Sequence, residues 1–142
     1  MPFPGARWWK VDFHSHSPAS FDFGGLEGVP TQSVATYEEW LLAYMKAGID
    51  AVVIADHNTH EGIDLARAAL VTLAESGNRD FRKLVLFPGV ELTVDGGFHL
   101  LGVFDPSVAS DVVTASFIGR SIRENGAQVT ARPNSRFKRL LN

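Results

Sequence analysis

The segment VDFHSHS, residues 11–17, places two histidines one residue apart at the end of an apolar run. Side chains alternate between the two faces of a β-strand, so Asp12, His14 and His16 are expected on one face and Phe13 on the other. Two imidazoles on one face can bind the same ion. The pattern also fits two polar residues near a strand end that each have a hydrogen-bond partner, because a lone His-x-His motif is not specific.

Further ligand-type side chains follow later apolar runs. Asp56 and His57 end the run IDAVVIADHN, a position where Asp, His and Asn also suit an ordinary turn. Glu91 follows the LVLF run, and His99 opens the run FHLLGVF. The carboxyl ends of neighbouring parallel strands meet at one rim, where α/β active sites are assembled. Because clustered imidazoles and carboxylates need partners, the sequence predicts a metal site at this rim.

Other polar residues are less informative. Asp22, in the loop after the histidine pair, is either a further ligand or an ordinary loop carboxylate. His60 is interpreted as a solvated residue at the start of a helix and Asp95 as a turn residue, and neither is assigned a role. The chain has no cysteine, no G-x-S-x-G motif and no phosphate-binding G-x-x-x-x-G-K-[ST] loop, which argues against a thiol or serine nucleophile.

Helices and strands that would position these residues are visible in the pattern. TYEEWLLAYMKAG predicts a helix that Thr36 caps together with Glu39 and that Gly48 ends. Residues 61–76 have apolar side chains at helical spacing, and Gly77 follows as a stop signal.

IDAVVIADHN, RKLVLFPGVEL and FHLLGVF predict strands, the first of them buried on both faces. A third helix is expected over residues 110–125 and a last strand at AQVTA. Strands alternating with helices predict an α/β fold with a parallel sheet or barrel.

Length and composition limit the classes of protein to which the chain can belong. At 142 residues one domain is expected, and its longest apolar runs are too short to span a bilayer. We see no secretory signal, and the absence of cysteine fits a cytoplasmic protein. A net charge of −3 argues against a nucleic-acid surface over the whole chain. Residues 132–142 carry four cations and no acid, and we interpret them as a disordered basic tail rather than a nucleic-acid arm.

Taken in order, DFHSHSPASFD, AGIDAVVIADHN, FPGVEL and FHLLGVF resemble the motifs of the PHP (polymerase and histidinol phosphatase) superfamily over about the first 105 residues. WWKVDFHSHSPASFDFG and WLLAYMKAGIDAVVIADHN look most like the PHP domains that precede AAA-type ATPase modules. The resemblance implies a distorted (β/α)7 barrel that holds up to three divalent ions (Zn, Mn, Fe or Mg) and hydrolyses phosphoesters with a metal-activated water.

The resemblance also implies roles for individual residues. Asp12 and Asp56 would orient ligating histidines, since the second nitrogen of such a ring needs an acceptor. The implied metal ligands are His14, His16, Asp22, His57, Glu91 and His99.

The chain departs from the family pattern late in the sequence. Arg132, in TARPN, stands where the family has a histidine, and no final Asp-x-His pair follows. An arginine stays protonated and cannot bind a metal. We therefore expect a PHP-type domain over residues 1–131 that is incomplete at its C-terminal side, followed by the tail over residues 132–142.

Two functions remain open. One is a phosphoesterase that acts on a phosphorylated small molecule or a nucleic acid. The other is a noncatalytic metal-binding module that serves as a scaffold or regulatory piece of an ATPase or nuclease system, without membrane association. An amidohydrolase is disfavoured, because the sequence shows no strand with a lysine that could be carboxylated.

Overall fold

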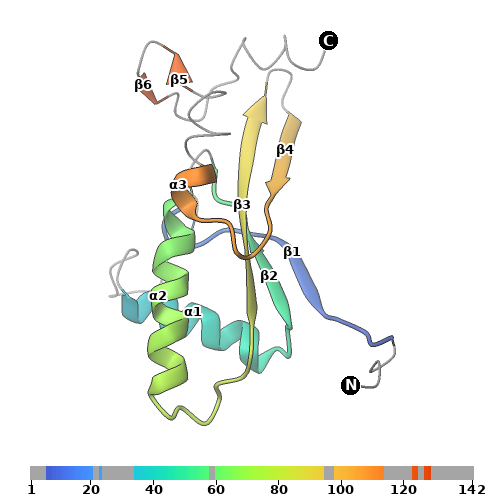
Figure 1. Cartoon of the computed structure of the whole chain (residues 1–142), viewed down its shortest axis with the longest axis vertical. Coiled ribbons are helices and arrows are strands. Elements are labelled where there is room, and N and C mark those ends of the chain that lie inside the picture. Colours follow the sequence, from blue (N-terminus) through green and yellow to red (C-terminus); the bar gives the residue numbers. More distant parts are fainter. Residues whose placement is uncertain are drawn as a thin grey trace.

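The computed structural model describes residues 6–20, 23, 34–57, 60–94, 98–113, 123–124 and 127–128. Their main feature is a four-stranded sheet in the order β1-β2-β3-β4, with helices α1 and α2 packed against each other and α2 alongside β3 (Figure 1). The sheet strands are β1 (Val11–Ser15), β2 (Ala51–Ile54), β3 (Val85–Val94) and β4 (Phe98–Val103). The helices are α1 (Val34–Lys46), α2 (Glu61–Glu75) and α3 (Ser110–Val113), and β5 (Arg123–Glu124) pairs with β6 (Ala127–Gln128).

Strand β2 forms the centre of the core. All four of its residues are buried, and it pairs in parallel with β1 on one side and β3 on the other. The β-branched run AVVI suits such a position, because parallel strands are covered on both faces. Val52 and Ile54 pack in one apolar cluster with Tyr37 and Leu41 of α1 and Ile63 of α2. The prediction of a doubly buried strand is confirmed.

Helix α1 begins earlier than the sequence indicates. Its first residue is Val34, so Thr36 lies inside the helix with its side chain fully buried, and the prediction that Thr36 caps it is wrong. Its end is as predicted. Gly48 adopts φ +76°, and the amides of Gly48 and Ile49 donate to the carbonyls of Met45 and Tyr44. This is the hydrogen-bond pattern of a Schellman motif, which favours glycine because a side chain is strained at positive φ.

Strand β4 departs from the expected parallel arrangement. It follows β3 after residues 95–97 and pairs with it antiparallel, with Glu91 opposite Leu101 and Thr93 opposite His99. A parallel crossover needs a dozen or more residues, which this connection does not have. The fold is therefore mixed α/β, and it is the start of β4 that lies near the carboxyl end of β3.

The later predictions are only partly met. The helix expected over residues 110–125 is present as the short α3 and is wrong at Arg123–Glu124, which form a strand; residues 114–122 lie outside the described residues. The strand expected at AQVTA is present at Ala127–Gln128. Asp22, Asp95, Arg132 and the basic tail lie outside the described residues. In the part of the chain that is described, no helix is both long and apolar enough to cross a membrane.

Candidate metal centre

The carboxylate of Glu91 lies at the centre of a cluster of imidazoles. Glu91 is in β3 and only 2% exposed, and its backbone amide donates to the carbonyl of Asp56. A buried carboxylate is costly unless polar or charged groups surround it. Here four histidines from three segments provide those groups: His14, His16, His57 and His99.

The histidine pair contacts one oxygen of this carboxylate. The Nε2 atoms of His14 and His16 lie 2.7 and 2.8 Å from Glu91 Oε2, and 3.2 Å from each other. The two rings therefore lie on the same side of the chain, as predicted for two histidines one residue apart.

The other two histidines complete the cluster. His57, just after β2, has its Nε2 3.6 Å from Glu91 Oε2, and its ring centroid lies 4.7 Å from that of His16. His99, in β4, contacts the second carboxylate oxygen, Oε1, through Nδ1. The structure thus brings together five of the six residues predicted as ligands. The sixth, Asp22, is not among the described residues.

Electrostatics favour an ionised carboxylate at this position. Burial alone would raise the pKa of Glu91, but hydrogen bonds from His16, His99 and His14, together with the charge of His57, lower it below its ordinary value. When the facing ring nitrogens are deprotonated, they and the ionised carboxylate form a nitrogen and oxygen ligand set of the kind that divalent cations bind.

The positions of the ligand atoms fit a metal ion. Ligands about 2.0–2.1 Å from zinc lie about 3.3 Å apart in a tetrahedral shell and about 2.9 Å apart in an octahedral one. The three atoms His14 Nε2, His16 Nε2 and Glu91 Oε2 have separations of 2.7–3.2 Å. A second group, formed by His57, Glu91 and His99, also brings one ligand atom from each residue within 4.8 Å of the others. Because Glu91 belongs to both groups, His14, His16 and Glu91 would hold one ion, and His57, Glu91 and His99 would hold a second.

A buried hydrogen-bonded pair holds β1 against the end of β2. Asp56 is 1% exposed, and its two oxygens accept hydrogen bonds from the backbone amide and the hydroxyl of Ser17, each 2.6 Å long. Ser17 directly follows His16 and Asp56 directly precedes His57, so this pair fixes the spacing of two candidate ligands. Gly62 of α2 lies against it, and a Cβ there would overlap Ser17 Oγ and Asp56 Oδ2.

The sequence did not predict that Ser17, Asp56 and Gly62 pack together. Ser17 merely follows a histidine, and Gly62 merely lies in the first turn of a helix. Neither position forms a sequence pattern that indicates this contact. Asp56 accepts both of these hydrogen bonds from Ser17. The resemblance to the PHP superfamily instead implies that Asp56 accepts a hydrogen bond from a histidine ring.

Asp12 lies elsewhere than strand alternation predicts. The pairing of β1 with β2 shifts register between Asp12 and Ser15. Asp12 accordingly lines a hollow with Tyr44 of α1, and Ser15 also contacts the Tyr44 hydroxyl. The carboxylate of Asp12 accepts the backbone amide of His14 at 3.2 Å. The expectation that Asp12 shares the histidine face is therefore wrong, because a β-bulge reverses the alternation.

Comparison of the chain with known proteins finds only weak similarity. No protein-family model and no curated protein matches the sequence. Among solved structures, the chain is similar to an amidohydrolase from Chromobacterium violaceum, with 20% identity and a TM-score of 0.45 over 79% of this chain and 33% of that one. It is also similar to a "putative metal-dependent phosphoesterase" from Bifidobacterium adolescentis, with 27% identity and a TM-score of 0.46 over 80% of this chain and 33% of that one. The chain spans about a third of the length of each of these structures.

Proposed function

We propose that this chain is a divalent-metal-dependent phosphoesterase domain of the PHP type. The observation that carries the proposal is the buried carboxylate of Glu91, with imidazole nitrogens of His14 and His16 on one oxygen and of His99 on the other. Nitrogen and oxygen ligands of this kind accept Zn, Mn or Fe, and the absence of cysteine leaves no thiolate to select among them.

Each side chain has a distinct task in this proposal. Glu91 bridges the two ligand groups, while His57, which is 10% exposed, anchors the inner side of the cluster. His14 and His99 are about half exposed, so the cluster opens to solvent where a substrate can approach. Ions held there would lower the pKa of a water molecule and neutralise charge on phosphoryl oxygens. The attacking group would then be water, and no protein nucleophile would be required.

A phosphorylated substrate, small molecule or nucleic acid, suits a site whose charge comes from cations. An amidohydrolase with a carboxylated lysine is a poorer fit. The described lysines are Lys10, Lys46 and Lys83, which precede β1, end α1 and precede β3 respectively, away from the histidine cluster. The family subtype linked to ATPase modules, an ATPase partner and a cytoplasmic location all remain predictions.

One observation favours a second candidate function. Arg132 occupies the position where the PHP motif has a histidine, and an arginine stays protonated and cannot bind a metal. A site with only the early ligands would bind metal without cleaving phosphoesters. The chain would then act as a metal-binding scaffold or regulatory module of an ATPase or nuclease system.

Hydrolysis of p-nitrophenyl phosphate and bis-p-nitrophenyl phosphate separates the two functions. The protein is loaded with Mn²⁺ or Zn²⁺ and compared with Glu91→Gln, which keeps the shape of residue 91 and removes its charge. His60→Gln is the matched control, because His60 precedes α2 and belongs to neither ligand group. The phosphoesterase proposal predicts turnover that needs metal, is lost in Glu91→Gln and persists in His60→Gln. Metal binding without turnover would contradict it and favour the scaffold.

A further inference from the structure

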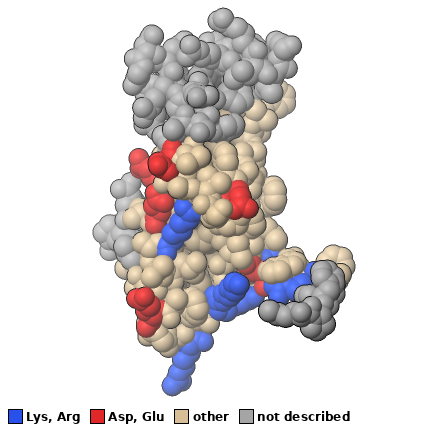
Figure 2. Space-filling model, viewed as in Figure 1, with Lys and Arg blue, Asp and Glu red and all other residues tan. Residues whose placement is uncertain are grey.

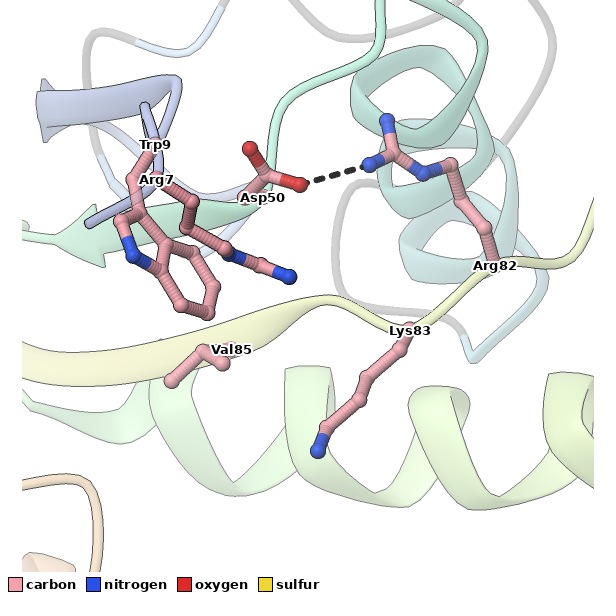
Figure 3. A pocket seen from close by; sticks show the side chains of 6 residues that line it. All are labelled: Arg7, Trp9, Asp50, Arg82, Lys83 and Val85. Atoms are coloured by element: carbon pink, nitrogen blue, oxygen red, sulfur yellow. Dashed lines mark hydrogen bonds and ion pairs between the residues drawn. The ribbon is translucent and has the colours of Figure 1, made fainter. Parts of the chain in front are cut away.

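A second cavity lies at the opposite end of the sheet from the histidine cluster. Its volume is about 320 Å³, within the range of small-molecule sites. Trp9, Asp50 and Lys83 come from the segments that lead into β1, β2 and β3, so the cavity sits at the amino ends of these strands. Its lining residues are Arg7, Trp9, Asp50, Arg82, Lys83 and Val85 (Figure 3).

The lining carries a surplus of positive charge. The single carboxylate, Asp50, is fully engaged: one oxygen accepts from Arg82 at 2.7 Å and the other from the backbone amide of Lys10 at 2.9 Å. That amide and the nearby guanidinium groups of Arg82 and Arg7 lower the pKa of Asp50. In the part of the chain that the structure describes, Arg7 and Lys83 form no ion pair with a carboxylate. Two of the three lining cations are thus available to an anion.

An aromatic surface adjoins these cations. The guanidinium carbon of Arg7 lies 3.3 Å from the centroid of the Trp9 ring, and Figure 3 shows the two side chains together at one side of the cavity. Trp9 remains 53% exposed. A tryptophan face or a guanidinium plane can stack on a nucleobase, and stacking of this kind does not depend on base identity.

The surface around the cavity has the same character. Figure 2 shows most of the visible Lys and Arg side chains toward the lower end of this face, near where β2 and β3 begin, with some acidic side chains beside them, while acidic and basic side chains also lie together higher up. An anion approaching this end of the molecule is therefore attracted rather than repelled.

We propose that this cavity binds a nucleotide unit, with the phosphate contacting Arg7 and Lys83 and the base stacking on the part of Trp9 that Arg7 leaves exposed. A bare phosphate would leave the exposed indole unused, and an uncharged aromatic compound would leave the two cations unpaired. The proposal does not depend on metal at the histidine cluster, because the two sites lie at opposite ends of the sheet.

The test is a calorimetric titration of the whole chain with AMP in EDTA, so that no metal-bound site contributes. Saturable binding is expected, weakened about tenfold in Trp9→Leu and about tenfold in Lys83→Gln, as for loss of one stacked ring or one charged phosphate contact. Matched controls are Trp8→Leu, which alters a neighbouring, fully exposed tryptophan, and Lys46→Gln, which alters a lysine paired with Asp80 on the surface. Both controls should bind AMP as the wild type does.

Additional ligands test each half of the proposal. Inorganic phosphate and adenosine should each bind more weakly than AMP, and equal binding by either one would overturn the two-part recognition. Absence of saturable AMP binding, or equal weakening in the control variants, would also overturn it. A single-stranded oligonucleotide that binds more tightly than AMP would identify the nucleotide as part of a strand, whereas tighter AMP binding would identify a free nucleotide.

Discussion

The substitution Gly62→Ala sets local helix propensity against packing at the candidate site. Gly62 lies in the first turn of α2, where alanine is the better helix former by about 1 kcal/mol. A Cβ at this position, however, would overlap Ser17 Oγ and Asp56 Oδ2 and lie 2.9 Å from Ser17 Cβ. The neighbouring pair is buried, so it cannot move aside into solvent.

The expected cost follows from the hydrogen bonds that must break. The carboxylate of Asp56 accepts two hydrogen bonds from Ser17, and each buried group left unsatisfied costs about 1–3 kcal/mol. After the gain in helix propensity is subtracted, Gly62→Ala should lower the free energy of unfolding by about 1–5 kcal/mol, a large share of the stability of a small domain. Urea denaturation followed by far-UV circular dichroism measures this change.

The same substitution should weaken metal binding, because Ser17 and Asp56 adjoin His16 and His57. Gly77→Ala is the matched control at the far end of the same helix. Gly77 has φ +66° and open space around its Cα, so alanine there is strained by about 1–2 kcal/mol without touching the cluster. Equal or higher stability of Gly62→Ala with unchanged metal affinity would refute the assignment of the Ser17–Asp56 pair as the support of the site.

Two further substitutions test other parts of the structure. Ser17→Ala removes one donor to Asp56 and should lower the free energy of unfolding by about 1–3 kcal/mol in urea titrations; a neutral result would contradict a structural role for that hydroxyl. Asp50→Asn should destabilise the protein at pH 7, since the hydrogen bond from the backbone amide of Lys10 and the charge of Arg82 lower the pKa of Asp50 below its ordinary value of 3.8. Because a lowered carboxyl pKa stabilises the folded state above the unfolded pKa, this difference should shrink as pH falls below about 3.8. A difference that stays constant from pH 7 to pH 3 would rule out the charge of Asp50 as its cause.

Patterns within single elements could be interpreted correctly from the sequence. The apolar run between Asp50 and Asp56 contains no polar residue, and the structure buries β2 within it on both faces. Gly48 ends α1 because only a residue tolerant of positive φ fits there. The meeting of His14, His57 and Glu91 was predicted from the rule that neighbouring parallel strands end at one rim, and Glu91 reaches that rim from inside β3, just beyond the part of β3 that pairs with β2.

Features that depend on tertiary context could not be predicted in the same way. Thr36 is a good capping residue by type, but α1 already begins at Val34 and the side chain of Thr36 is fully buried inside the helix. The β-bulge after Asp12 has no glycine or proline to mark it. The antiparallel direction of β4 did have a signal, since the VDGGF connection is too short for a crossover, but an apolar run itself suits either direction.

The metal content of the purified protein tests the central claim most directly. Wild type and the double variant His14→Ala with His16→Ala are equilibrated with Mn²⁺ or Zn²⁺, freed of excess ion and measured by elemental analysis. If Glu91 bridges two ligand groups, the wild type should hold two ions per chain and the double variant should lose at least the ion bound by the histidine pair. A wild type that retains no more metal than the double variant would contradict the account.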